Sequence, residues 1–153
     1  MAVTMKLEGF KELERELERL SKSVGKAALR RALRKSAQPL ADKMQAGAPV
    51  EEGDLRDSIG VSTKLSPRQS RLHRKMFRND KASVEMFVGA GPLPQAHLQE
   101  FGTVKQSPQP FARPAWDADN KAMLERLKTD LWAEVEKSVA RAERKAARNA
   151  AKG

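Results

Sequence analysis

Several residue types that carry chemistry in other proteins are missing or rare in this sequence. Its 153 residues include no cysteine, no tyrosine, two histidines, five phenylalanines and two tryptophans. The absence of cysteine excludes disulfide frameworks, cysteine zinc sites, iron–sulfur clusters and thiol nucleophiles. No apolar run approaches the roughly 20 residues that cross a bilayer, and residues 1–10 lack the apolar segment of a signal peptide. We therefore expect a soluble protein made without export, with a core of Leu, Val, Ala and Met.

Residues for catalysis or metal binding are equally scarce. The two histidines are His73 and His97, and His97 lies three residues before Glu100 without a third ligand at metal-binding spacing. The glycines do not form a phosphate-binding or dinucleotide-binding pattern. We expect no enzyme activity, no metal and no cofactor.

Positive charge is what the chain has in excess. Thirty Lys and Arg face 20 Asp and Glu, which gives a net charge of +10. The excess lies in residues 1–35, 63–81 and 136–153, around a mildly acidic centre. Such segments contact either a polyanion or another subunit. The internal segment carries Lys64, Arg68, Arg71, Arg74, Lys75, Arg78 and Lys81.

The spacing of apolar residues predicts a long helix at each end of the chain. An amphipathic stripe runs from Leu7 to Leu20 and continues to Met44, as one helix or as two joined near residues 21–25, ending before residue 47. Pro39 should kink this helix or end it early. A second long helix is expected from residue 115 to about 148, with its basic end protruding or fraying.

Between these helices the pattern predicts a small sheet. Residues 55–63 and 82–90 alternate as strands that pair antiparallel, and residues 64–81 form a basic loop or hairpin tip between them. A short helix over 95–101 should stop at Gly102, before an extended, proline-rich segment over 107–114. We expect an α+β fold in which a small antiparallel β-sheet packs with long N-terminal and C-terminal α-helices. Residues 1–139 would form one domain, with 140–153 as a basic tail.

Four short sequence motifs in a fixed order are the most specific feature of the sequence. They are GDLRDSI at residues 53–59, VG at 88–89, EFGT at 100–103 and PFARPA at 110–115. In this order they resemble the tail-component family of long-tailed bacteriophages, the neck or tail-completion proteins of the lambdoid siphophages. The residues that we single out as structural motifs are Gly53, Leu55, Ser58, Ile59, Glu100, Phe101, Gly102, Thr103, Pro110 and Pro114.

Each motif also has a physical interpretation. Residues 53–55 predict a tight turn from loop into strand, with Leu55 and Ile59 anchored in the core. Phe101 should point inward at the end of the short helix, and Gly102 should take a positive φ. Phe111 either packs on its own core or docks on a neighbouring subunit, and Arg113 could pair with Glu100 or Asp54. The candidate contact residues are Arg68, Arg71, Arg74, Lys75, Arg78, Phe111 and Arg113.

The resemblance implies a virion structural protein of the neck, made in the cytoplasm of the host bacterium. It would form an oligomeric ring, expected to be a hexamer, at the head-proximal end of the tail and help to join head to tail. Its partners would be other copies of itself, the head–tail connector, the tail terminator, the tail tube and, non-specifically, phage DNA passing through the channel. A tail-terminator or connector role within the same neck is an alternative, as is a small basic DNA-binding or packaging-associated protein.

A charge pattern suggests how copies would meet. Glu12, Glu14, Glu16 and Glu18 lie in the first predicted helix, where like charges four residues apart repel each other. Our hypothesis is that this acidic face contacts the basic segment 64–81 of the next copy.

Overall fold

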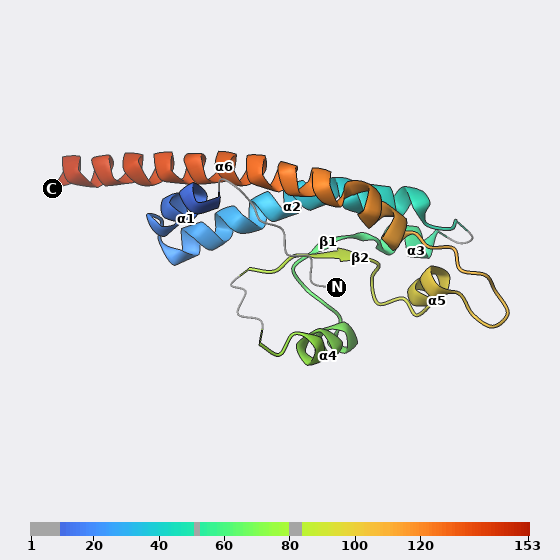
Figure 1. The fold of residues 1–153 in the computed structure, drawn as a ribbon. Helices are drawn as coiled ribbons and strands as arrows, with labels where there is room; N and C mark the ends of the chain where they lie inside the picture. The colour runs from blue at the N-terminus through green and yellow to red at the C-terminus, as the bar shows by residue number, and fades with distance from the viewer. Residues whose placement is uncertain (1–9, 51–52, 80–83) are drawn as a thin grey trace.

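The computed structural model describes residues 10–50, 53–79 and 84–153, and it has the α+β fold that the sequence predicts (Figure 1). A two-stranded antiparallel sheet pairs Val61 with Val88. Helices surround it. In chain order the elements are α1 (Phe10–Glu18), α2 (Lys22–Gly47), α3 (Asp54–Ser58), β1 (Gly60–Ser62), α4 (Pro67–Met76), β2 (Phe87–Gly89), α5 (Gln95–Phe101) and α6 (Ala112–Lys152).

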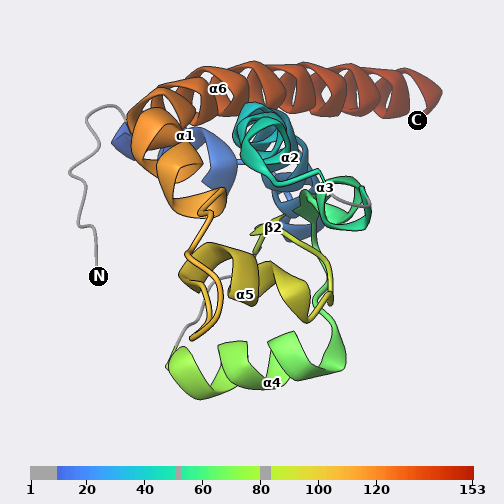
Figure 2. The same ribbon diagram turned by 90° about the vertical axis from the view of Figure 1, so that its right-hand side faces the viewer.

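The two long helices form the backbone of the molecule. α2 and α6 run antiparallel along most of the length of α2, and α1 packs on the same side of α6 (Figure 1). The sheet lies against α2, and α4 is the element farthest from α6 (Figure 2). The break between α1 and α2 at residues 19–21 confirms the two-helix form of the predicted N-terminal stripe, of which residues 7–9 lie outside the described residues. Pro39 lies inside α2, which continues to Gly47.

Two apolar clusters hold the helices together. One joins the second half of α2 to α3, the sheet and the start of α6, through Leu40, Met44, Ala48, Leu55, Ile59, Phe111 and Ala115. The other joins α1 to the first half of α2 and the middle of α6, through Leu13, Ala32, Leu131 and Val135. The C-terminal end of α6 extends beyond both clusters, because the sequence after Val139 has no large apolar residue to bury.

The predicted strands are shorter than expected. Residues 54–58 form α3 instead of the start of a strand, so the predicted turn from loop into strand at residues 53–55 is wrong. Gly53 takes φ +80° as the residue before this helix, and Leu55 and Ile59, four residues apart, both reach the core as the sequence predicts. The second strand covers only Phe87–Gly89, and the first two residues of its predicted range lie outside the described residues.

The segment predicted to be a basic loop or hairpin tip contains a helix, α4. Ser66 begins it with a capping box, because its hydroxyl accepts the Gln69 N–H at 3.3 Å while the Gln69 side chain accepts the Ser66 N–H at 3.1 Å. Pro67 occupies the first turn, where a missing N–H costs nothing. No side chain of α4 is fully buried, which agrees with the lack of a clear apolar period in its sequence.

The C-terminal half follows the sequence more closely. α5 covers residues 95–101 as predicted, and Gly102 ends it with φ +77°. α6 begins at Ala112, three residues earlier than expected, and Pro114 lies in its first turn. The helix continues to Lys152, so the basic tail protrudes as a regular helix and does not fray. Over the residues described, no helix has the length and apolar character that a membrane crossing requires.

Candidate interaction surfaces

The carboxylate of Glu100 caps the N-terminus of α6. It accepts the backbone N–H of Phe111 at 2.8 Å and of Ala112 and Arg113 at 3.0 Å. These are N–H groups that have no partner within the helix, and the helix dipole favours a negative charge at this end. Hydrogen bonds therefore join residues of the EFGT and PFARPA motifs directly, and they fix α5 to the start of α6.

The cap also perturbs the titration of Glu100. Partial burial raises the pKa of this carboxyl, but the three backbone N–H groups and the positive charge of Arg113 lower it more, so the pKa lies below its ordinary value. Glu100 is therefore ionised at neutral pH and engaged with backbone. Both carboxylate oxygens of Glu100 are thus engaged in the helix cap.

The loop between α5 and α6 is closed by Gly102. Its φ is +77°, and a side chain there would place Cβ 2.8 Å from the Pro108 N and 2.9 Å from the Pro108 Cδ. The Thr103 N–H donates to the carbonyl of Gln106 at 2.9 Å, and the Thr103 hydroxyl accepts the Gln106 N–H at 3.0 Å. This turn holds residues 103–106 on the outside of the molecule.

The side chains of this region divide into a buried and an exposed group. Phe111 is 4% exposed and belongs to the core, which is the first of the two roles that the sequence allowed it. Phe101 is 65% exposed, so the prediction that it points inward is wrong. The inner side of α5 is formed instead by Ala96, Gln99 and Glu100, because the cap on α6 requires the glutamate there. The guanidinium of Arg113 lies 5.6 Å from the centre of the Phe101 ring.

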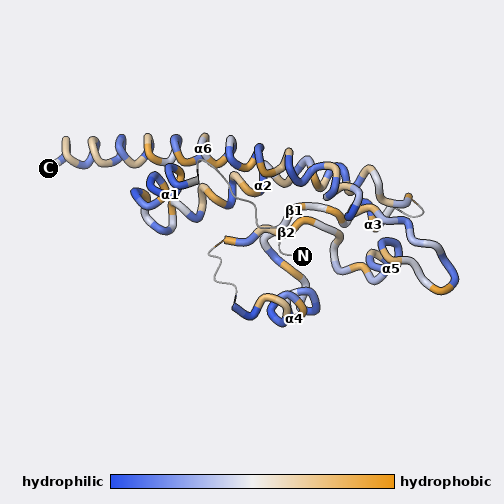
Figure 3. The backbone as a smooth tube through the Cα atoms, viewed as in Figure 1, coloured by the Kyte–Doolittle hydropathy of each residue, from blue (hydrophilic) through white to orange (hydrophobic). Residues whose placement is uncertain are grey.

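α4 presents a second exposed surface, which is both basic and apolar (Figure 3). Leu72, Met76 and Phe77 are exposed by half or more. The candidate contact residues Arg68, Arg71, Arg74, Lys75 and Arg78 are exposed on or beside the same helix. His73 holds α4 to the sheet, because its ring lies edge-on to Phe87 at 5.2 Å. A groove of about 610 Å³ separates α4 from α5, with Leu72, Leu93 and Ala96 in its lining.

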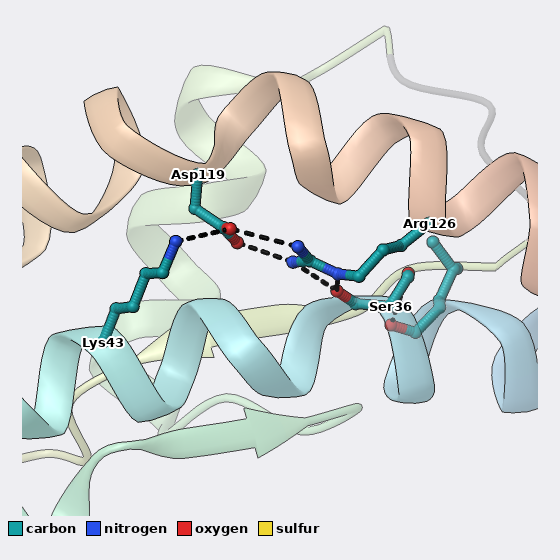
Figure 4. Close-up of polar contacts among 5 residues, drawn as sticks. Ser36, Lys43, Asp119 and Arg126 are labelled. Atoms are coloured by element: carbon teal, nitrogen blue, oxygen red, sulfur yellow. Dashed lines mark hydrogen bonds and ion pairs between the residues drawn. The ribbon is translucent and has the colours of Figure 1, made fainter.

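Polar side chains meet between α2 and α6 and form a polar layer (Figure 4). Asp119 of α6 is 1% exposed, and Arg126, two turns along, donates to its two oxygens at 2.6 and 3.0 Å. Lys43 of α2 donates to the same carboxylate at 2.9 Å. Arg126 also donates to the carbonyl of Ser36 in α2, at 3.1 and 3.3 Å, in the turn that precedes Pro39. The layer thus joins the two long helices through charged hydrogen bonds.

This layer was not predicted from the sequence, although a signal was present. Asp119 occupies the helical position between Ala115 and Met123, on the stripe that α6 buries, where an unpaired carboxylate would be costly. The hydrogen bonds from Arg126 lower the pKa of Asp119, burial raises it, and Lys43 lowers it further, so the pKa lies below its ordinary value. The carboxylate of Asp119 is buried and its two oxygens are bonded by Arg126 and Lys43, so we assign the layer a structural role.

The candidate contact residues are therefore not brought to one place. Five of them belong to the α4 surface, while Arg113 lies at the start of α6 and Phe111 is buried beneath it. The side chain of Arg113 faces the Phe101 ring, and its backbone N–H, instead of its guanidinium, bonds Glu100. Within residues 10–50, 53–79 and 84–153 there is no group of three or more His, Cys, Asp or Glu that could hold a metal ion.

Comparison with known protein families gives one match. A model of bacteriophage HK97-gp10-like tail components matches residues 11–102, which is more than half of the chain. The matched stretch contains GDLRDSI, VG and the first three residues of EFGT, and it includes all of α2, α4 and α5. No curated protein and no solved structure matches the chain.

Proposed function

Since this chain belongs to the HK97-gp10-like family of bacteriophage tail components, we propose that it is a tail-completion protein of the neck, which forms a ring at the head-proximal end of the tail. The family is one of structural proteins of the virion and not of enzymes. A tail component contacts other tail proteins. The neck position, the ring and the joining of head to tail are the finer steps of the proposal.

The observation that carries the proposal is the α4 surface. No side chain of α4 is fully buried, yet the helix and the residue after it expose Leu72, Met76 and Phe77 beside a row of arginines. Apolar anchors surrounded by Arg are the composition of protein–protein hot spots, and a helix with so little of its surface buried gains stability when a partner covers it. We infer that α4 is a subunit contact.

The exposed glutamates of α1, which lie on both sides of its apolar stripe, are the partner that we propose for α4. Glu12, Glu14 and Glu18 are exposed on α1, while Glu16 pairs with Arg19 at 3.1 Å. α4 and α1 occupy different parts of the molecule (Figure 1), so the α4 of one copy would bind the α1 of the next. A contact between two different surfaces repeats head to tail, and it closes into a ring when the rotation between copies allows it. A hexamer is the number that we expect.

Such a ring would contact the head–tail connector, the tail terminator and the tail tube, and DNA would pass through its centre. The exposed patch of Phe101 and Arg113, with Leu98 three residues earlier on α5, is available for one of these neighbours. Its position is rigid because Glu100 fixes α5 to α6.

The experiment compares the assembly of the full chain with that of charge-reversed variants. The triple variant R71E/R74E/R78E should lose the oligomer that the wild type forms, as measured by analytical ultracentrifugation and electron microscopy of the particles. Adding E12R, E14R and E18R to this variant should restore assembly, because the two reversed surfaces again carry opposite charge.

The matched control is K22E/K26E/R30E on α2, which changes the net charge by the same amount on another surface and should still assemble. The proposed contact is wrong if R71E/R74E/R78E forms normal rings, or if the compensating variant fails to recover them while remaining folded. A wild-type chain that stays monomeric at its highest attainable concentration would contradict self-assembly altogether.

A further inference from the structure

A second strongly basic stretch, besides α4, runs through α2. Between Glu18 and Asp42 the chain has seven basic residues and no acidic residue. Three of the seven have ion-pair partners: Arg19 with Glu16, Arg31 with Glu134 and Lys35 with Asp130. The other four have no ion-pair partner in the part of the chain that the structure describes. They are Lys22, Lys26, Arg30 and Arg34.

These four residues form a ladder. Each lies four positions after the last, so neighbouring side chains are close on the helix surface. Three are exposed and Lys26 is half-buried. Twelve residues of helix place the first and last about 18 Å apart. Like charges at this spacing destabilise a helix, and a ligand of opposite charge would relieve the repulsion.

The protruding end of α6 extends this basic surface. Residues 141–152 carry five basic side chains and one acidic residue, Glu143. The first part of this arm lies beside the N-terminal end of α2, and the rest of it projects beyond that end (Figure 1). A groove of about 600 Å³ between them is lined by Arg31 of α2 and by Arg141 and Lys145 of the arm. The ladder residues do not line this groove themselves, but Arg30 is the sequence neighbour of Arg31, which does.

Self-assembly does not remove the excess positive charge. Each copy carries a net charge of +10, so an assembly of identical copies keeps +10 for every copy it contains. The contact proposed between α4 and α1 uses the exposed glutamates of α1 and does not involve the ladder or the arm. A molecule with net negative charge is therefore the class of ligand that matches this surface.

The chemistry of the surface favours phosphate over protein. Val24, 39% exposed, is the one large apolar side chain exposed on the described part of α2, and residues 140–153 have no apolar side chain larger than Ala. The α4 surface has three large apolar anchors, whereas this one has charges on long, mobile stems. Protein interfaces depend on such anchors, while contacts to the nucleic-acid backbone need only Lys and Arg.

We propose that the ladder of α2 and the arm of α6 form a binding surface for the phosphate backbone of duplex DNA, independent of base sequence. The binding belongs to the single chain and does not rest on ring formation. The proposal concerns a site on this protein, whereas passage of DNA through a ring requires no site.

The test measures binding of the full chain to a fluorescently labelled mixed-sequence duplex of about 20 base pairs, which is longer than the ladder. Fluorescence anisotropy is recorded between about 50 and 200 mM salt. The affinity should fall steeply with salt. In a plot of the logarithm of the binding constant against the logarithm of the salt concentration, each phosphate contacted should contribute about −0.9 to the slope.

Two variants with the same change in net charge locate the site. K22E/K26E/R30E/R34E removes the ladder, and R68E/R71E/R74E/R78E alters α4. The ladder variant should bind at least about tenfold more weakly than the α4 variant and should show a slope shallower by about 3 to 4. If a reversed variant fails to fold by circular dichroism, the corresponding quadruple Gln variants replace both.

Three results would overturn the proposal: no binding at the lowest salt, equal losses in the two variants, or displacement of the duplex by polyglutamate as effectively as by unlabelled DNA. The last would identify an acidic protein as the ligand. Loss of assembly in the α4 variant with DNA binding retained supports the proposal, because it separates this surface from the subunit contact.

Discussion

The carboxylate of Glu100 and the backbone of Phe111 are joined by a 2.8 Å hydrogen bond, although eleven residues separate them. Glu100 is the last polar residue of α5, and Phe111 is the residue that precedes α6 while filling the core beneath it. This bond connects the EFGT and PFARPA motifs physically. The first motif supplies the charge that caps a helix, and the second supplies the start of that helix and an apolar anchor.

Replacing Glu100 should therefore destabilise the start of α6. We expect Glu100→Ala to lower the free energy of unfolding by about 2 kcal/mol, since it removes a helix cap and a favourable charge at the helix N-terminus. Urea denaturation measures the change. Glu136→Ala, at an exposed position later in α6, is the matched control and should change stability by less than about 0.5 kcal/mol. Equal effects of the two substitutions would contradict the capping role.

The buried carboxylate of Asp119 should be more sensitive. Asp119→Asn leaves Arg126 and Lys43 without their anionic partner, at an expected cost of about 2 to 3 kcal/mol. This is below the cost for a fully buried pair, because the side chains of Arg126 and Lys43 are 30% and 48% exposed and remain partly solvated. Asp130→Asn, whose partner Lys35 is 69% exposed, should cost less than about 1 kcal/mol. Chemical denaturation of both variants checks the order, and the reverse order would refute it.

Stability should fall in acid for a defined reason. The pKa values of Asp119, Glu100 and Glu134 all lie below their ordinary values; for Glu134 the cause is its hydrogen bond from Arg31, with partial burial acting the other way. A carboxyl whose pKa is lowered by folding stabilises the fold above the unfolded pKa of about 4, and this stabilisation is lost as the pH falls through the folded value.

The free energy of unfolding should therefore decline below about pH 4, and less steeply in a variant that combines Glu100→Ala with Asp119→Asn. Urea denaturation at a series of pH values tests this. A variant that loses stability as steeply as the wild type would assign the acid sensitivity to other groups.

Gly102→Ala should disturb the loop that follows α5. The new Cβ would lie within 3.0 Å of the Pro108 backbone, at a φ that side chains rarely adopt, so we expect a loss of more than about 1 kcal/mol. Gly60→Ala is a suitable control, because no heavy atom lies within 4 Å of a Cβ built there. Thermal unfolding of both variants provides the comparison, and a silent Gly102→Ala would be inconsistent with the close approach of Pro108.

Truncation of Phe111 should reduce stability far more than truncation of Phe101. Phe111→Ala opens the core and should cost about 3 to 5 kcal/mol. Phe101→Ala removes an exposed ring and should leave stability within about 1 kcal/mol of the wild type. Denaturation curves distinguish the two. A large loss of stability from Phe101→Ala would mean that its ring supports the fold and is not held for a partner.

The elements that bury an apolar face were predictable from the sequence. α2 and α6 follow the spacing of their apolar residues, and Gly102 marks the end of α5. α4 was not predicted, since it has no fully buried side chain and its sequence suggests no apolar period, although Ser66, Pro67 and Gln69 form a helix start that local chemistry could have identified. Local capping signals therefore deserve the same weight as periodicity where a segment is polar throughout.

The interior polar contacts were less predictable. Pairing of Asp119 with Lys43 depends on which turns of α2 and α6 meet, and this is a property of the tertiary packing. The prediction that Phe101 points inward was wrong for the same reason, because Glu100 is needed on the inner side of α5 and the Phe101 ring therefore faces outward. The candidate contact residues on α4 remain predictions, as does the ring.

The polar layer also affects how far the basic arm of α6 projects. A shift of α6 along α2 by one turn, or about 5.4 Å, would require both apolar clusters to repack. It would also move the buried charge of Asp119 away from both of its cationic partners. This carboxylate therefore helps to set the register of the two helices, and with it how far the basic arm projects from the body of the protein.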